Sequence, residues 1–220
     1  MRAIGQIYKL ISFMFFSLLV GLVFMEKADT DENGKLRYNP GLGAEFKLIG
    51  QRYSARQERI ETTDKIKSIV SVSNDALYDS PESVALYILE KCEEYDLEPA
   101  LVLAIIRTES NFQRFVVSHK GAVGLMQLLP PTASEIAPAA KVDYSNSNVL
   151  YHHRQNIALG TYYLSEMIKR FGDEKIAVEA YNRGPSAIRR TIRKGKRIRY
   201  YYADRVWKHY EKYSHTLTAM

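Results

Sequence analysis

The strongest constraint on the fold is an unbroken apolar run, Ala100–Ile106, that follows a helix-start signal. Glu98 and Pro99 stand just before the run, as is typical of the first turn of a helix. A helix that is apolar on every side is stable in water only when other elements surround it. The run is therefore expected to form the central, buried helix of a domain.

Helical signals continue on both sides of this run. Ser80-Pro81-Glu82 is a helix start, because Ser caps the first turn and Pro suits the first helical position. Strand-like alternation is absent. Further helices are expected at 148–171, 174–181 and 200–213. The predicted fold class is mainly α, with one helical domain over 80–214.

A second constraint lies at the start of the chain. Leu10–Met25 holds 16 residues without a charge, after Arg2 and Lys9 and before several acids. This charge order predicts an N-terminus inside the cell and the rest outside. We expect residues 1–25 to be a transmembrane signal anchor, because the end of the apolar run is a poor signal-peptidase cleavage site. The alternative is a signal peptide that is cleaved, which would leave a secreted domain. Residues 26–79 are expected to be a linker with a membrane-proximal helix over 51–72.

Charge and cysteine content narrow the function classes. The formal net charge is +6, and residues 189–212 hold ten basic against two acidic side chains. Such a patch favours a polyanionic partner: nucleic acid, lipid headgroups or an acidic wall polymer. Cys92 is the single cysteine, so no intrachain disulfide forms, and its apolar neighbours predict burial. No metal site or organic cofactor is indicated.

Glu109 is the residue in which chemistry is expected. It follows Ile105 by four residues and Ile106 by three, so it shares a helix face with core positions. Burial disfavours a carboxylate, and the C-terminal end of a helix adds partial negative charge. Both effects raise the pKa of a carboxyl. A protonated carboxyl near neutral pH is what a general acid requires.

Three motifs occur in order around this residue. Glu109-Ser110-Asn111-Phe112 is followed by Gly121–Ala133, which contains Gly124-Leu125-Met126-Gln127, and then by Ala180–Pro185, which reads Ala-Tyr-Asn-Arg-Gly-Pro. The ordered set resembles the soluble-lytic-transglycosylase family, whose catalytic domain is lysozyme-like. The resemblance covers about 81–213. It implies a lysozyme-like transglycosylase domain preceded by the N-terminal transmembrane or signal helix.

The resemblance implies roles for seven side chains. Glu109 would act first as the acid and then as the base. Tyr181 would hydrogen-bond near Glu109. The remaining residues would contact substrate, line its groove or orient the acid: Ser110, Ser118, Met126, Gln127 and Asn182. For Ser118 and Asn182, turn formation is an alternative role.

Two positions depart from the family pattern. Glu179 stands where the family has a small apolar residue, and we expect its side chain to point to solvent. Near the C-terminus the family shows E-T-x-x-Y-V-x-x-V, whereas Ile198–Val206 of this chain lacks the Glu-Thr pair and is basic and rich in Tyr. The second departure puts the shape of this end of the groove in question.

The resemblance implies cleavage of peptidoglycan glycan strands between N-acetylmuramic acid and N-acetylglucosamine, with a 1,6-anhydro product. The expected location is the inner membrane, with the catalytic domain in the periplasm. One alternative is a hydrolytic, goose-type lysozyme in which Glu179 or Asp143 positions water. Another is a non-catalytic wall-binding assembly protein, against which the intact Glu109, Gln127 and Tyr181 argue. A location outside the cytoplasm argues against nucleic acid as the partner.

Overall fold

The computed structural model describes residues 40–71 and 80–219. The apolar segment Leu10–Met25 lies outside these residues, so the expected membrane helix is not among the elements that follow. The chain divides into two compact units, of which the first ends at Ile60 and the second begins at Glu61. Within the described ranges, no helix combines the length and the apolar character needed to cross a bilayer.

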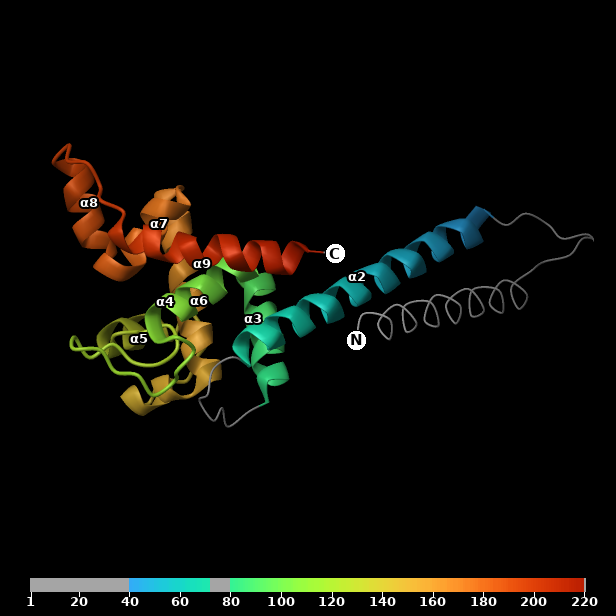
Figure 1. The fold of residues 1–220 in the computed structure, drawn as a ribbon, viewed down its shortest axis with the longest axis horizontal. Helices are drawn as coiled ribbons and strands as arrows, with labels where there is room; N and C mark the ends of the chain where they lie inside the picture. Colours follow the sequence, from blue (N-terminus) through green and yellow to red (C-terminus); the bar gives the residue numbers. More distant parts are fainter. Residues whose placement is uncertain (1–39, 72–79, 220) are drawn as a thin grey trace, which may run out of the picture. The chain divides into compact units, whose positions relative to one another are not determined.

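Helices make up the described chain (Figure 1). Between α4 and α5 the chain forms loops whose pairing is limited to the isolated bridges Val117–Val123 and Val123–Leu128. The predicted mainly α fold class is confirmed. The elements are α2 (Pro40–Val70), α3 (Pro81–Tyr95), α4 (Pro99–Ser110), α5 (Pro130–Ile136), the 3-10 helix η1 (Ser147–Tyr151), α6 (His153–Phe171), α7 (Glu174–Arg183), α8 (Pro185–Arg193) and α9 (Tyr201–Thr218).

Helix α4 is the centre of the core, as its apolar sequence predicts. Each residue of Ala100–Ile106 is at most 4% exposed. Helix α9 packs along α4, and α3 packs against both α4 and α6. Helix α6 in turn packs against α7. The arrangement buries α4 on all sides and brings its C-terminal end, with Glu109, beside α9.

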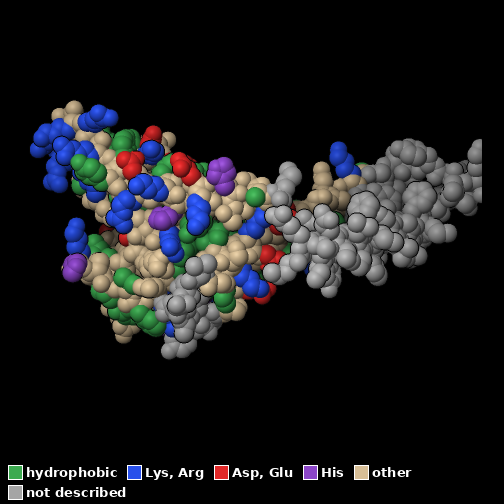
Figure 2. Space-filling model, in the orientation of Figure 1, with side chains coloured by type: hydrophobic (Ala, Val, Ile, Leu, Met, Phe, Trp, Pro, Cys, Tyr) green, Lys and Arg blue, Asp and Glu red, His purple; other side chains and the backbone are tan. Residues whose placement is uncertain are grey.

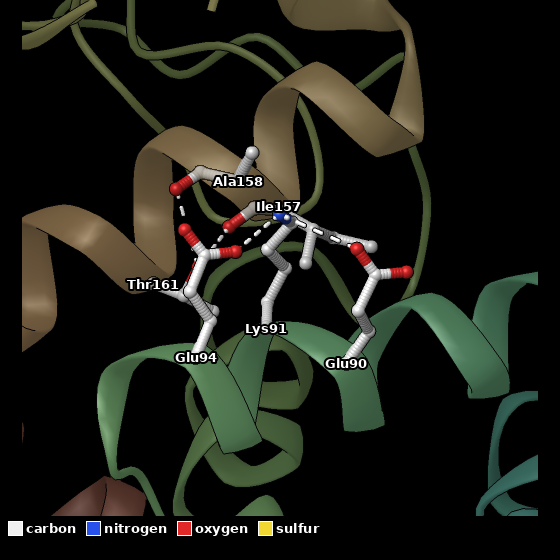
Figure 3. Close-up of polar contacts among 6 residues, drawn as sticks. All are labelled: Glu90, Lys91, Glu94, Ile157, Ala158 and Thr161. Carbon is white, nitrogen blue, oxygen red and sulfur yellow. Dashed lines mark hydrogen bonds and ion pairs between the residues drawn. The ribbon is translucent and has the colours of Figure 1, made fainter. Parts of the chain in front are cut away.

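The contact between α3 and α6 shows how polar side chains are accommodated near the core (Figure 3). Thr161 is fully buried on α6, and its hydroxyl donates to the carbonyl oxygen of Ile157 at 2.7 Å. On α3, the Lys91 Nζ donates to Glu94 Oε2 at 2.6 Å. Each of these polar groups has a partner on its own helix, so the two helices pack without an unpaired group at these positions.

Helix α2 begins earlier than the sequence predicted, at Pro40 instead of residue 51. The sequence Asn39-Pro40-Gly41 is typical of a turn, but Pro is also favourable at the first position of a helix. The last turns of α2 belong to the second unit, where Ile66 and Val70 are buried. Part of the expected linker is therefore a helix that contributes to the core of that unit.

Candidate active site

A cavity of about 490 Å³ lies beside the C-terminal end of α4. Its walls come from the end of α4, the loop before α5, the start of α5, one residue of α6 and the end of α7. The lining residues are Glu109, Ser118, His119, Lys120, Ala122, Gln127, Leu128, Leu129, Thr132, Tyr163, Tyr181, Asn182, Arg183 and Gly184. Glu109 is the only acidic side chain among them.

Glu109 is half-buried in this wall, and Tyr202 of α9 donates its phenolic O–H to Glu109 Oε1 at 2.6 Å. Burial raises the pKa of Glu109 above its ordinary value, while the Tyr202 hydrogen bond and the positive charge of Arg205 oppose the rise. The net direction is upward, as its position beside the core predicts. A carboxyl with a raised pKa and one fixed hydrogen-bond donor is suited to general acid catalysis.

Two buried phenols flank Glu109. Tyr181 was expected to hydrogen-bond near the acid, but its O–H donates to the Met126 carbonyl oxygen at 2.8 Å. The donor to Glu109 is Tyr202 instead. Burial and the negative charge of Glu109 raise the pKa of both phenols well above the usual range. Both phenols therefore stay protonated and act as donors.

The loop that follows α4 is held in place by Asn156 of α6, which is completely buried. Its Nδ2 donates to the carbonyl oxygens of Val123 (3.0 Å) and Leu150 (2.9 Å), and its Oδ1 accepts from Met126 N (2.8 Å). Gly124 has a φ of +84°, and a Cβ there would lie 2.3 Å from Asn156 Nδ2. Only glycine suits both the backbone conformation and this close approach.

Gln127 and Ser118 line the cavity and also brace its loop. The Gln127 side-chain amide donates to the carbonyl oxygens of Val116 (2.9 Å) and Gly124 (3.0 Å). Ser118 Oγ accepts from Ala122 N at 3.0 Å. These bonds occupy the amide nitrogen of Gln127, so its side-chain oxygen is the atom left for a ligand.

The structure brings five of the seven predicted site residues together at the cavity: Glu109, Ser118, Gln127, Tyr181 and Asn182. Ser110 and Met126 are not part of the lining. Ser110 is 4% exposed and donates its hydroxyl to Ile106 O at 3.1 Å. The Met126 side chain is fully buried and packs so closely on α6 that a Cβ at Gly160 would lie 2.3 Å from its sulfur. These two residues support the wall from inside.

The expectation that Glu179 points to solvent is wrong, because this residue is 2% exposed. Its Oε2 accepts from the backbone N–H groups of Tyr202 and Ala203, both at 3.1 Å, and its Oε1 lies 3.7 Å from Arg183 Nη1. The first turn of a helix has unpaired N–H groups and partial positive charge, which together attract a carboxylate. Glu179 therefore faces the start of α9 and does not line the cavity with Glu109.

Sequence reasoning missed Tyr202 as a site residue. A signal was present, since Tyr202 occupies the Tyr position of the family pattern E-T-x-x-Y, and the absence of the Glu-Thr pair obscured it. Asn156 was missed for a different reason. A lone Asn within a helical segment carries no sequence signal, and only the folded loop reveals its three hydrogen bonds.

The helical fold, with one carboxyl in a cavity between α4, α7 and a glycine-containing loop, defines a lysozyme-like domain. Residues 86–202 match the family model described as the transglycosylase SLT domain. The chain belongs to this family.

Curated relatives and solved structures agree with this assignment. A soluble lytic murein transglycosylase of Salmonella typhimurium is 38% identical over 96 residues, which is 43% of this chain and 15% of that protein. A membrane-bound lytic murein transglycosylase C of Haemophilus influenzae is 26% identical over 189 residues, 80% of this chain and 53% of that protein. The chain thus spans about half the length of the second relative and less of the first.

A similar solved structure is that of the 70 kDa soluble lytic transglycosylase of Escherichia coli. The two chains are 27% identical with a TM-score of 0.54, over 60% of this chain and 24% of the other. The lytic transglycosylase Slt of Pseudomonas aeruginosa matches with the same identity, score and coverage. In both cases the similarity covers a part of the larger protein that carries this domain's fold.

Proposed function

We propose that this chain is a peptidoglycan lytic transglycosylase that cleaves the β-1,4 bond between N-acetylmuramic acid and N-acetylglucosamine. One observation carries the proposal: a half-buried carboxyl with a raised pKa, Glu109, is the one acid in the cavity of a transglycosylase SLT domain. The names of the relatives, lytic murein transglycosylases, support peptidoglycan as the substrate.

In the first step Glu109 gives its proton to the glycosidic oxygen as that oxygen leaves the muramic acid C1. Most glycosidases use a second carboxylate to stabilise the positive charge that develops at this carbon. With no second acid in the cavity lining, the acetamido oxygen of the muramic acid itself takes this part, as in substrate-assisted hydrolases. Tyr202 stabilises the carboxylate that Glu109 becomes, because its O–H donates to Oε1.

In the second step the Glu109 carboxylate removes the proton from the C6 hydroxyl of the same sugar, and O6 attacks C1. This closure forms the 1,6-anhydro bond, restores the proton to Glu109 and consumes no water. The goose-type hydrolytic alternative requires an acid to position water. Glu179 faces α9, and Asp143 is not among the lining residues, which favours the non-hydrolytic route.

Substrate contacts are proposed for Ser118, Gln127, Tyr181 and Asn182 on the ground that they line the cavity with Glu109. Ser110 and Met126 are proposed to act indirectly, through the wall that they support. The catalytic domain is proposed to span 80–214, together with the last turns of α2, which pack in the same unit.

A location in the cell envelope follows from peptidoglycan as substrate and is supported by the membrane-bound relatives. We propose that residues 1–25 anchor the chain in the inner membrane, with the domain in the periplasm. Protease accessibility of the domain in spheroplasts, compared with intact cells, tests this orientation. Protection of the domain in spheroplasts would contradict it.

The decisive experiment compares wild type with Glu109→Gln on purified sacculi, with the products analysed by mass spectrometry. Gln keeps the volume and accepts the Tyr202 hydrogen bond but cannot donate a proton as an acid. Wild type is expected to release anhydro-muropeptides and the variant none, with unchanged circular dichroism. Products with reducing ends, heavier than anhydro products by one water, would show that the mechanism is hydrolytic. Full activity of Glu109→Gln would refute the role of Glu109 as the acid.

A further inference from the structure

A second cavity, of about 960 Å³, lies between the end of α7, the segment after α8 and the start of α9. Arg183 lines both this cavity and the one that contains Glu109, so the two adjoin. We call it the basic cleft. Its lining residues are Glu179, Arg183, Thr191, Lys196, Arg197, Ile198, Arg199, Tyr200, Tyr201 and Asp204.

The charge of the basic cleft is unbalanced. Its two acids are already engaged: Glu179 with Arg183 and the start of α9, and Asp204 with Lys175 at 3.7 Å. Lys196, Arg197 and Arg199 are exposed, and none of them forms an ion pair with another described residue; Arg199 donates to the Tyr201 hydroxyl at 3.4 Å. Figure 2 shows a dense group of Lys and Arg side chains over α8 and its surroundings. Three cations without an acidic partner in a concave wall favour an anionic ligand.

Rotation of these side chains toward a ligand would present two guanidinium groups and one ammonium. Arg recognises carboxylates through paired N–H donors, and the half-open shape of a cleft reduces the screening that flat surfaces experience. Tyr201 adds an apolar contact, because 70% of its surface is exposed. These features fit a narrow chain that carries several carboxylates along an otherwise uncharged backbone.

We propose that the basic cleft binds the carboxylates of the short peptides that branch from the glycan strand, and so selects peptide-bearing strands over naked ones. The proposal rests on the proposed function, since the peptide reaches the cleft only when its sugar occupies the adjoining cavity. A membrane surface is the competing ligand for a basic patch. It is flat, and it would contact the outward-facing Arg189, Arg190 and Arg193, which do not line the cleft.

The test measures kcat/KM for anhydro-end release from peptide-bearing strands and from the same strands stripped by an amidase. A cleft variant combines Lys196→Ser, Arg197→Ser and Arg199→Ser. A matched surface variant combines Arg189→Ser, Arg190→Ser and Arg193→Ser, which removes the same charge from α8 outside the lining. The ratio of the two kcat/KM values should fall about tenfold in the cleft variant, equivalent to about 1.4 kcal/mol, and stay constant in the surface variant.

An unchanged ratio in the cleft variant, or an equal fall in both variants, would overturn the proposal. The proposal would also be overturned if the cleft variant bound phosphatidylglycerol vesicles more weakly than wild type while its ratio of kcat/KM values stayed unchanged. That result would make lipid the ligand of the cleft. If wild type releases no anhydro ends from either strand, the proposed function fails instead. The cleft is then tested by calorimetric titration of Glu109→Gln with a free muramoyl peptide, whose affinity should fall about tenfold when the cleft substitutions are added.

A second observation concerns the departures from the family pattern at Glu179 and at Ile198-Arg199. They meet in the structure at one place, the start of α9. Glu179 holds the backbone N–H of Tyr202, and the side chain of the same Tyr202 donates to Glu109. We infer that Glu179 is a positioning residue, which fixes the start of α9 and thereby aims the Tyr202 phenol at the acid.

A purely structural role for Glu179 would change stability without changing the pH profile. The positioning role predicts that Glu179→Ala moves the alkaline limb of the pH profile of kcat/KM in the same direction as Tyr202→Phe does. In the double variant, Glu179→Ala should move this limb no further than Tyr202→Phe alone. Glu179→Gln, which retains one acceptor oxygen, should give a smaller movement and serves if the Ala variant does not fold. A limb that stays in place in both variants, or full additivity with Tyr202→Phe, would refute this role.

Discussion

Replacing Tyr202 with Phe is the sharpest perturbation of the candidate acid. The ring stays in its buried site, where Tyr202 is 5% exposed, and only the O–H that reaches Glu109 Oε1 at 2.6 Å is lost. This bond favours the charged carboxylate, so its removal raises the pKa of Glu109 further.

The magnitude follows from the geometry. A hydrogen bond to a charged group contributes about 1.5–3 kcal/mol, and one pKa unit corresponds to about 1.36 kcal/mol. Because the Glu109 carboxyl faces a cavity, water replaces part of the lost bond. We therefore expect the pKa of Glu109 to rise by about one unit, the lower end of that range.

The assay is the pH dependence of kcat/KM on peptidoglycan, which reports the ionisations of the free enzyme. In the proposed first step the protonated form of Glu109 is the active one, so the alkaline limb of the profile should move about one unit to higher pH. Tyr210→Phe on the same helix is the matched control, since its O–H donates to the distant, exposed Glu98. A limb that stays in place or moves to lower pH would refute the role given to this phenol.

Three further predictions concern stability and reactivity. The folded-state pKa of Glu109 lies above its unfolded value, so its contribution to stability is full below about pH 4.3 and is lost as pH rises through the folded pKa. At a pH above the folded pKa, Glu109→Gln should therefore melt at a higher temperature than wild type. A lower Tm of the variant at that pH would contradict the argument from burial. Gly124→Ala should lower the free energy of unfolding by about 2–4 kcal/mol in denaturant titration, because its Cβ meets Asn156. Gly172→Ala, at φ +68° in open space, should lower it by about 1–2 kcal/mol. Equal losses in the two variants would contradict the close approach at Gly124. Cys92, buried and with its thiol pKa raised by burial, should react with maleimide only after denaturation, and rapid labelling of the native chain would disprove its burial.

The sequence predicted the core better than the edges. The apolar run Ala100–Ile106 left only one environment in which it is stable, and α4 has that environment. The start of α2 was misjudged because Asn39-Pro40-Gly41 satisfies both a turn and a helix start. Local patterns cannot separate these outcomes when the deciding contacts lie elsewhere.

In the candidate site, the predictions succeeded where a side chain belongs to a contiguous motif and failed where a contact joins distant segments. Tyr202 and Glu109 are 93 residues apart, and Tyr202 and Glu179 are 23 apart. Helical periodicity relates residues three or four positions apart and carries no information on such pairs. The same limit explains the error at Glu179, since its partner is the backbone of another helix.

The position of Tyr202 in the last helix has a consequence for biosynthesis. All three motifs that identify the family precede α9, yet the donor to Glu109 belongs to α9. During translation the acid therefore remains without its phenol until nearly the whole domain has left the ribosome. A truncated chain can thus carry every signature of the family and still lack the assembled acid.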